Sequence, residues 1–258
     1  ALTLDSWPWR LRIQSLGSFS IERDDAPDAF RGKHGKPLEL LKVAVAFGGN
    51  EVNVDRITDV LWPRIDADYA HRSFNTTLHR LRRLLGDEHA ITLQGGKLSL
   101  NARWFWLDTW ALEHAIAAGN ECLGATGDLL DHDALIRHTE AVLALYAGPF
   151  MRDTDEAWAL AARESWQRRY VRFLTSVARF LTDSGHGDAA VRFLERGIEA
   201  DELAEPLYRQ LMMSYEVLDR NADVVETFER CRRVWQSRLG REPSDETLKL
   251  REQLAQNA

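Results

Sequence analysis

The hydrophobic and polar positions near the start of the chain alternate with a period of two. Trp9, Leu11 and Ile13 fall on one side of an extended segment, and Arg10 and Arg12 fall on the other. This period is typical of a β-strand with one buried face. The alternation resumes around residues 19–21, after a break at "SLG", so the sequence predicts a short antiparallel sheet.

Helical spacing follows in two short segments. In "KPLELLKVAVAFGG" (residues 36–49), apolar residues recur every three or four positions, with a proline in the first turn and a Gly-Gly pair at the end. The second segment, "NVDRITDVLW" (residues 53–62), has Asn53 as its N-cap and ends before Pro63. Each segment predicts a helix.

A third helix, over Ala70–Leu85, and a hairpin complete the first part of the chain. The segment "AITLQGGKLSLN" (residues 90–101) contains two alternating runs joined through Gly95 and Gly96, which is typical of a tight β-hairpin. The predicted order is therefore a sheet, three helices and a hairpin. This is the α+β arrangement of a winged helix-turn-helix.

The third helix has two chemically different sides. At about 100° per residue, Phe74, Leu78, Leu81 and Leu85 form one narrow stripe, which is the predicted buried side. The polar residues across from this stripe are Arg72, Thr76, His79 and Arg83, flanked by Asn75 and Arg80. From residue 69 to 86 the chain carries four arginines and no acidic residue. Such side chains contact base edges and phosphates, so the face predicts DNA binding; the alternative is a merely solvated charged face.

From about residue 107 the pattern becomes helical throughout. Asp188 and Phe193 recur 35 residues later as Asp223 and Phe228, and the Glu-Arg pair at 195–196 recurs 34 residues later. These separations are close to the period of about 34 residues in tetratricopeptide repeats. The sequence therefore predicts an all-α domain of paired helices stacked into a short superhelix, because one pair alone cannot cover its apolar face.

Composition adds an asymmetry of charge. The 258 residues are 45% hydrophobic and carry a net charge of -7. Residues 1–108 contain 15 basic and 14 acidic side chains, whereas residues 109–258 contain 18 and 26, so the acidic excess lies in the helical part. No apolar run of membrane-spanning length or signal-peptide pattern occurs, and the only cysteines, Cys122 and Cys231, lie far apart, so we expect a cytoplasmic protein. The start at Ala1 rather than Met indicates a processed or excised fragment.

Other candidate chemistry is weak. The segment "QGGKLS" lacks the full spacing of a phosphate loop and fits a wing instead. The segment "DHDALIRH" (residues 131–138) lacks metal-ligand spacing and fits a solvated helix start. We expect the tryptophans within residues 104–110 to form the joint between two domains. Because no nucleophile–base pair or acid pair is evident, we expect neither an enzyme nor a bound metal or cofactor.

Both parts resemble known bacterial domains. The segments "KPLELLKVAVAFGGNEVNVDRITDVLW", "HRSFNTTLHRLRRLLG" and "LQGGKLSLN" resemble the OmpR/PhoB-type winged-helix domain of transcription regulators. The segments "LDTWALE", "LYAGPF", "AWALAARESWQRRYVRFL" and "LGREPSDET" resemble the bacterial transcriptional activator domain, which follows the DNA-binding domain in the Streptomyces antibiotic regulatory protein (SARP) family. The resemblance covers nearly the whole chain and implies a DNA-binding domain over residues 8–107 and a helical domain over residues 108–258.

The resemblance implies a sequence-specific activator that binds direct repeats in promoter DNA and recruits RNA polymerase. Helix 70–85 is then the recognition helix, and the wing supplies a second contact. The implied DNA-binding residues are Arg72, Ser73, Asn75, Thr76, His79, Arg80, Arg83, Gly96 and Lys97. The segment "PRIDADYA" (residues 63–70) resembles the loop that related regulators direct at polymerase, which implies that Asp66 and Asp68 face a basic polymerase surface.

A competing hypothesis is a protein-interaction scaffold, in which the helical repeats bind a partner and the basic helix is only solvated. A third hypothesis adds a small-molecule effector or a partner domain bound by the repeats, and side-by-side binding to direct repeats implies a homo-oligomer on DNA. Binding to double-stranded DNA separates the first two hypotheses.

Overall fold

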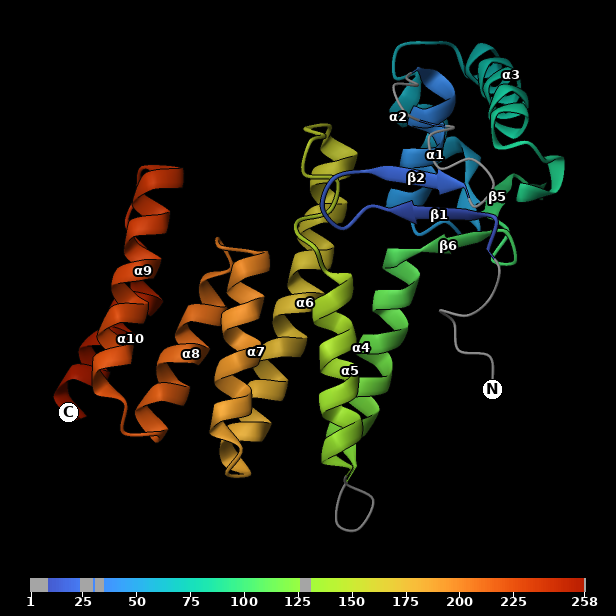
Figure 1. Ribbon diagram of the computed structural model, residues 1–258. Coiled ribbons are helices and arrows are strands. Elements are labelled where there is room, and N and C mark those ends of the chain that lie inside the picture. The colour runs from blue at the N-terminus through green and yellow to red at the C-terminus, as the bar shows by residue number, and fades with distance from the viewer. Residues whose placement is uncertain (1–8, 24–29, 31–34, 126–130, 258) are drawn as a thin grey trace. The chain divides into compact units, whose positions relative to one another are not determined.

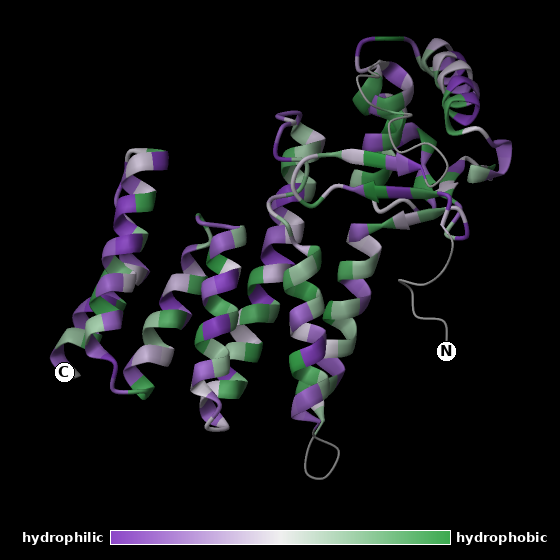
Figure 2. Ribbon diagram, in the orientation of Figure 1, coloured by the Kyte–Doolittle hydropathy of each residue, from purple (hydrophilic) through white to green (hydrophobic). Residues whose placement is uncertain are grey.

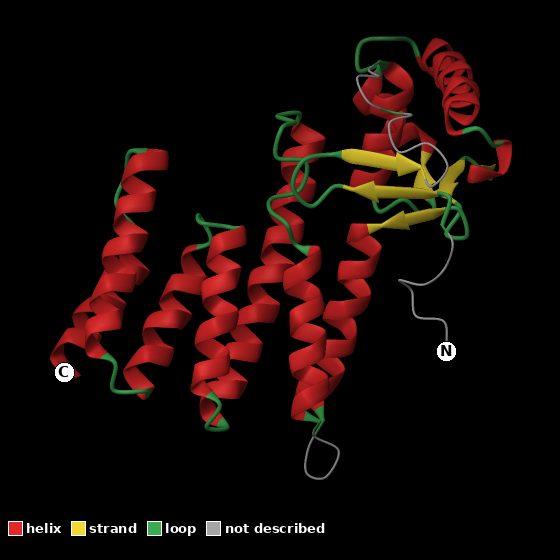
Figure 3. Ribbon diagram, in the orientation of Figure 1, coloured by secondary structure: helices red, strands yellow, loops and turns green. Residues whose placement is uncertain are grey.

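The computed structural model describes residues 9–23, 30, 35–125 and 131–257. The contacts divide the chain into two compact units, of which the first comprises residues 1–111 and 150–164 and the second residues 112–149 and 165–258. Within the described residues, strands occur only in the first unit, and the second is built from helices (Figure 3). The predicted fold class, a winged helix-turn-helix followed by an all-α domain, is confirmed.

The first unit has the predicted order of a sheet, three helices and a hairpin (Figure 1). Its elements are β1 (Leu11–Gln14), β2 (Ser20–Arg23), α1 (Lys36–Ala46), β3 (Val52–Asn53), α2 (Val54–Leu61), α3 (Ala67–Leu85), the 3-10 turn η2 (Glu88–Ala90), β4 (Ile91–Gln94), β5 (Lys97–Leu100) and β6 (Phe105–Leu107). As predicted, the side chain of Asn53 caps α2 by accepting the Asp55 N–H at 2.7 Å.

Two small sheets organise the first unit. In one, β1 lies between β2, which is antiparallel to it, and β6, which is parallel to it, so Ile13 is opposite both Ile21 and Leu107. In the other, β5 lies between β3 and β4, and Gly95 and Gly96 form the β4–β5 turn with φ of 56° and 72°. Strands β3 and β6 were not predicted, because two or three residues are too few to show alternation.

A buried carboxylate fixes the exit from β6. Asp108, which is 3% exposed, accepts the Ser15 hydroxyl at 2.7 Å and the backbone N–H of Leu16 at 2.6 Å. Burial raises the pKa of Asp108, while the hydrogen bonds from the backbone of Leu16 and Ser15 act in the opposite direction. Asp108 therefore joins the end of β1 to the first residue of α4 across more than ninety residues of chain.

A distant segment returns to the first unit. Phe150 forms a β-bridge with Leu16, and the N–H of Met151 donates to the carbonyl of Ser15 at 2.7 Å. The guanidinium of Arg163 holds this segment by donating to three backbone carbonyls, including that of Phe150 at 2.9 Å. Residues 150–164 thus belong to the first unit, although they follow α4 and α5 along the chain.

The tryptophans within residues 104–110 also make contacts in this unit. The guanidinium of Arg10 lies 4.2 Å from the ring centroid of Trp104, and that of Arg12 lies 5.4 Å from the ring of Trp106. The indole N–H of Trp110 donates to the carbonyl of Gly48 at 2.8 Å. Their expected role as a joint between domains stays a prediction.

The second unit is a run of amphipathic helices, with hydrophobic and hydrophilic residues interleaved along each one (Figure 2). The helices that build it, two of which begin in the first unit, are α4 (Asp108–Gly124), α5 (His132–Leu145), α6 (Ala157–Asp183), α7 (Gly187–Ala200), α8 (Glu205–Val217), α9 (Asn221–Leu239) and α10 (Asp245–Asn257). Helix α8 packs against both α7 and α9, as stacked helical repeats require.

The predicted repeat is visible in the contacts. Phe193 of α7 and Phe228 of α9 are buried at corresponding positions. The repeated arginine makes a similar contact in both copies, because Arg196 pairs with Glu140 of α5 and Arg230 pairs with Glu195 of α7 at 2.8 Å. Each repeat is thereby tied to an earlier helix.

A polar cluster lies within the core of the second unit. The rings of Tyr146 and Tyr170 are stacked with their centroids 3.8 Å apart. Asp201, 4% exposed, accepts the amide of Gln167 at 2.8 Å and the hydroxyl of Tyr146 at 3.4 Å. Burial raises the pKa of Asp201, whereas the hydrogen bond from Gln167 lowers it.

Replacing Asp108 by Asn tests the junction at the end of β6. An amide group cannot accept on both sides, so at least one buried N–H or hydroxyl donor of the Ser15–Leu16 segment loses its acceptor. We expect the free energy of unfolding to fall by about 2–3 kcal/mol, measured by urea denaturation. The exposed Asp155→Asn serves as the control and should change stability by less than about 0.5 kcal/mol. Equal stability of the two variants would contradict this role.

Candidate nucleic-acid interface

One side of α3 is buried as predicted. Phe74, Leu78, Leu81 and Leu85 are each between 0% and 4% exposed. They pack in the first unit, where α3 contacts both α1 and α2. Burial of this stripe fixes the rotation of the helix about its own axis and thereby selects the residues that face solvent.

The start of α3 differs from the prediction. The helix begins at Ala67 and not at Ala70, because the carboxylate of Asp66 caps it by accepting the N–H of Asp68 at 3.0 Å. The interhelical loop is correspondingly shorter than the predicted segment 63–70. Asp68 therefore lies in the first turn of the helix, and only Asp66 remains at the end of the loop.

The outward side of α3 carries the predicted polar residues. The exposed ones are Arg72, Asn75, Thr76, His79, Arg80 and Arg83, and Ser73 is half-buried. The longer helix adds two exposed residues to this side, Asp68 and Tyr69. The expectation of a face without carboxylates is therefore wrong for the first turn and right for the remainder of the helix. The same helical periodicity would have revealed Tyr69 if the cap had been recognised.

The arginines of α3 differ in how firmly they are held. The Nε of Arg72 donates to the carbonyl of Asp68 at 3.2 Å, and its guanidinium lies 5.6 Å from the ring centroid of Tyr69. The side chains of Arg80 and Arg83 have no hydrogen-bond or ion-pair partner among the described residues. Arg72 is thus oriented in advance, whereas Arg80 and Arg83 are available to an external anion.

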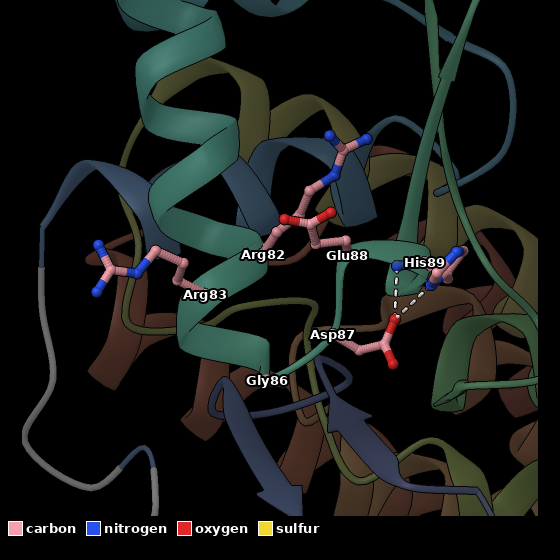
Figure 4. A pocket seen from close by; sticks show the side chains of 6 residues that line it. All are labelled: Arg82, Arg83, Gly86, Asp87, Glu88 and His89. Atoms are coloured by element: carbon pink, nitrogen blue, oxygen red, sulfur yellow. Dashed lines mark hydrogen bonds and ion pairs between the residues drawn. The ribbon is translucent and has the colours of Figure 1, made fainter.

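The fourth arginine of the helix joins α3 to the wing. Arg82 donates from Nε and from Nη2 to the carbonyl of Ile91, at 3.1 and 2.8 Å. Figure 4 shows that Arg82 and Arg83 leave the helix in different directions, so neighbouring arginines have different tasks. The sequence did not reveal this link, because the contact joins a helix to the first residue of a strand.

A hollow of about 440 Å³ lies at the C-terminal end of α3 (Figure 4). It is lined by Arg82, Arg83, Gly86, Asp87, Glu88 and His89. Asp87 caps the turn η2 and accepts from the backbone N–H of His89, and its carboxylate lies 3.1 Å from the imidazole Nδ1. Because the hollow mixes carboxylates with arginines, it does not form a cationic site.

The wing carries the remaining predicted contact residues. Gly96 is exposed in the β4–β5 turn, and Lys97 follows it as the first residue of β5. The Nζ of Lys97 lies 3.1 Å from a carboxylate oxygen of Glu51, and both side chains are more than half exposed. Exposed ion pairs contribute only about 0–1 kcal/mol, so a phosphate can replace Glu51 as the partner of Lys97.

Helix α2 positions α3 through a polar contact as well as through the core. The imidazole Nε2 of His71 lies 3.0 Å from Oδ1 of Asp55, in the first turn of α2. Both side chains are about half exposed or more, so this contact orients α3 without adding much stability.

Other candidate sites gain no support. No group of three or more histidine, cysteine, aspartate and glutamate side chains is placed to hold a metal ion within the described ranges. Asp131 caps α5 by accepting the Ala134 N–H, which confirms that residues 131–138 form a helix start. Both cysteines are free thiols. No described helix combines the length and apolar character needed to cross a membrane.

Comparison with known proteins identifies the helical part. The family model of the bacterial transcriptional activator domain matches residues 107–255, which is more than half of the chain. The chain belongs to this family. Its members are transcriptional regulators and not a class of enzymes, and the predicted resemblance to SARP-type activators is confirmed.

The relatives of this chain include the transcriptional regulatory protein EmbR of Mycobacterium tuberculosis and of Mycobacterium bovis. Each is 25% identical over 264 aligned residues, which cover 95% of this chain and 63% of the relative. A solved structure of M. tuberculosis EmbR in complex with a low-affinity phosphopeptide has the same fold, with a TM-score of 0.65 and 21% identity over 96% of this chain and 65% of that chain. The chain thus spans less than two thirds of these relatives.

Replacing Arg82 by Met tests the link between α3 and the wing. The change keeps most of the apolar stem but removes both donors to Ile91, so we expect the amides of β4 and β5 to exchange with deuterium faster. Loss of a charged donor corresponds to about 1.5–3 kcal/mol of local stability. Arg83→Met, which removes no described contact, should leave these amides unchanged. Identical exchange in the two variants would show that Arg82 does not hold the wing.

Proposed function

We propose that this protein is a sequence-specific, DNA-binding activator of transcription, with a winged helix over residues 8–107 and a helical regulatory module from residue 108. The observation that carries the proposal is the outward side of α3, where six exposed polar residues lie opposite a fully buried apolar stripe. A helix presented in this way by a helix-turn-helix fits the major groove.

The side chains suit the two kinds of contact that DNA requires. Arg72 and Asn75 are types that bond guanine and adenine through two hydrogen bonds, and Thr76 offers a methyl group to thymine. Arg80 and Arg83 are available to bind DNA phosphates. Gly96 and Lys97 of the wing contact the adjacent sugar-phosphate backbone of the DNA. Ser73, half-buried at the edge of this side, and His79 in its middle complete the proposed interface.

The family and the relatives support this proposal. EmbR is named a transcriptional regulatory protein, and the match of this chain to it extends over the winged-helix part as well as the helical part. Such a regulator is not an enzyme and works in the cytoplasm of a bacterium, where the free thiols of Cys122 and Cys231 remain reduced.

The proposed binding site is a direct repeat that holds two copies of the protein side by side. Repeated selection of bound fragments from a random pool of duplex DNA tests this arrangement. We expect two half-sites in the same orientation, with centres roughly one helical turn, about 10 base pairs, apart. An inverted repeat would contradict the proposed arrangement, and a protein that enriches no sequence at all would favour the interaction-scaffold hypothesis.

The variants Arg72→Ala and Arg80→Ala test the interface on the selected site. Each lost contact is expected to cost about 1–3 kcal/mol of binding free energy, and each lost phosphate contact to lower the slope of log affinity against log salt by about 1. Fluorescence anisotropy at several salt concentrations measures both quantities. The control is Arg179→Ala, which removes an equal charge from an exposed position in the second unit. Unchanged affinity and slope in both test variants would refute the proposed interface.

A polymerase contact is the proposed route to activation. Asp66 and Asp68 are exposed at the junction of the loop and α3, and the exposed Ile65 and Tyr69 lie beside them. Carboxylates beside exposed apolar side chains fit a basic surface that also offers an apolar contact.

The double change Asp66→Asn and Asp68→Asn separates activation from DNA binding. Asparagine caps a helix as well as aspartate does, so α3 is expected to keep its start at residue 67. We expect DNA affinity to be unchanged or tighter and transcription in a purified polymerase assay to be largely lost. Asp59→Asn, an exposed change on α2, should retain full activation. Full activation by the double variant would exclude this polymerase contact.

A further inference from the structure

Helix α6 contains a second basic stretch, in the acidic part of the chain. Residues 165–182 include four arginines and no acidic residue, whereas residues 109–258 as a whole carry 18 basic and 26 acidic side chains. All four arginines are exposed, so none of them serves as a buried structural charge.

Two of these arginines, Arg169 and Arg172, border a groove of about 310 Å³ between α4 and α6, inside the second unit. The helices approach closely at its end, because Gly119 leaves no room for a side chain: a Cβ there would lie 2.5 Å from the ring of Phe173. Ile116 and Ala117 of α4 and Trp166 of α6 line the groove, and none of the three is fully buried. The apolar lining of the groove is therefore partly exposed to solvent.

The rim of the groove is cationic. Arg169 is held in place by Glu113, 2.7 Å away, and by the ring of Trp166, whose centroid lies 4.9 Å from the guanidinium. The guanidinium of Arg172 has no partner among the described residues. Asn120 and Ser176 are exposed on the same rim and add an amide and a hydroxyl group.

We propose that this groove binds a small amphipathic organic anion, with its apolar body against Ile116, Trp166 and Phe173 and its anionic head at Arg172. The volume lies at the lower end of the range of about 300–1,000 Å³ found for small-molecule sites. Nucleic acid is a poor occupant, because phosphates leave an apolar lining uncovered and are repelled by Glu113.

A second pocket in the described part of this unit has a central cation that is already paired. The pocket of about 350 Å³ between α6 and α8 contains Arg209, but this guanidinium already lies 3.0 Å from Glu246 and donates to Thr247 at 3.1 Å. The buried carboxylate of Glu205 is also 3.6 Å away. An anion entering there would have to displace existing partners, whereas Arg172 requires no such exchange.

The dye 8-anilinonaphthalene-1-sulfonate tests the proposal, because it joins an aromatic body to one anionic group. We expect saturable binding with increased, blue-shifted fluorescence. Arg172→Gln should raise the dissociation constant of the dye about tenfold, because the change removes a charged hydrogen-bond donor. Ala117→Trp, at an exposed position, should abolish binding by filling the groove.

Arg179→Gln is the matched control, because Arg179 is exposed on the same helix and does not line the groove. It should bind the dye like the unaltered protein, and thermal melts should confirm that all three variants remain folded. The proposed site would be overturned if Arg172→Gln and Ala117→Trp bound the dye as tightly as the unaltered protein does. It would also be overturned if Arg179→Gln lost as much affinity for the dye as Arg172→Gln, or if the unaltered protein bound no dye.

Competition then tests the anionic head group. Octanoate should displace the dye, whereas octan-1-ol, which has the same chain without the charge, should not; equal displacement by both would overturn the assignment to an anion. The site does not depend on the proposed DNA interface, because its residues lie in the second unit. The DNA affinity of these variants can therefore be measured separately, and either proposal can fail while the other stands.

Discussion

Burial of one stripe of α3 is the constraint on which the proposed function depends. Phe74, Leu78, Leu81 and Leu85 are removed from water together, and each such side chain contributes about 1.5–3 kcal/mol. Turning the helix by one residue would expose part of this stripe and bury arginine in its place. The apolar residues thus decide which polar residues face outward, although they take no part in the proposed contacts themselves.

Residues far apart in the chain hold the scaffold around this helix. Asp108 joins β1 to α4, residues 150–164 return to the end of β1, and Arg82 fastens the wing to α3. In the second unit, Arg196 and Arg230 tie successive repeats to earlier helices. Arginine therefore serves three purposes in this chain. It forms a fixed link where a carbonyl or carboxylate is near, it is an exposed cation on α3, and it forms the cationic rim of the groove on α6.

The parts that the sequence predicted are those governed by local periodicity. Alternation of hydrophobic and polar residues identified β1, β2 and the wing, and helical spacing identified the three helices and the repeats. The rotation of about 100° per residue distinguished the buried side of α3 from its outward side. The missed features depend on distant partners or on short segments. Strand β6 has three residues and needs β1 beside it, and the return of residues 150–164 leaves no pattern in the sequence. The early start of α3 was missed because Asp66 was interpreted as part of a loop.

A crystal structure of the protein bound to its selected DNA site tests whether the outward side of α3 contacts the bases. We expect α3 to lie in the major groove with Thr76 and His79 against base edges, while Phe74 and Leu81 remain packed in the first unit. A complex in which another surface of the first unit contacts the duplex, with the outward side of α3 in solvent, would contradict this expectation.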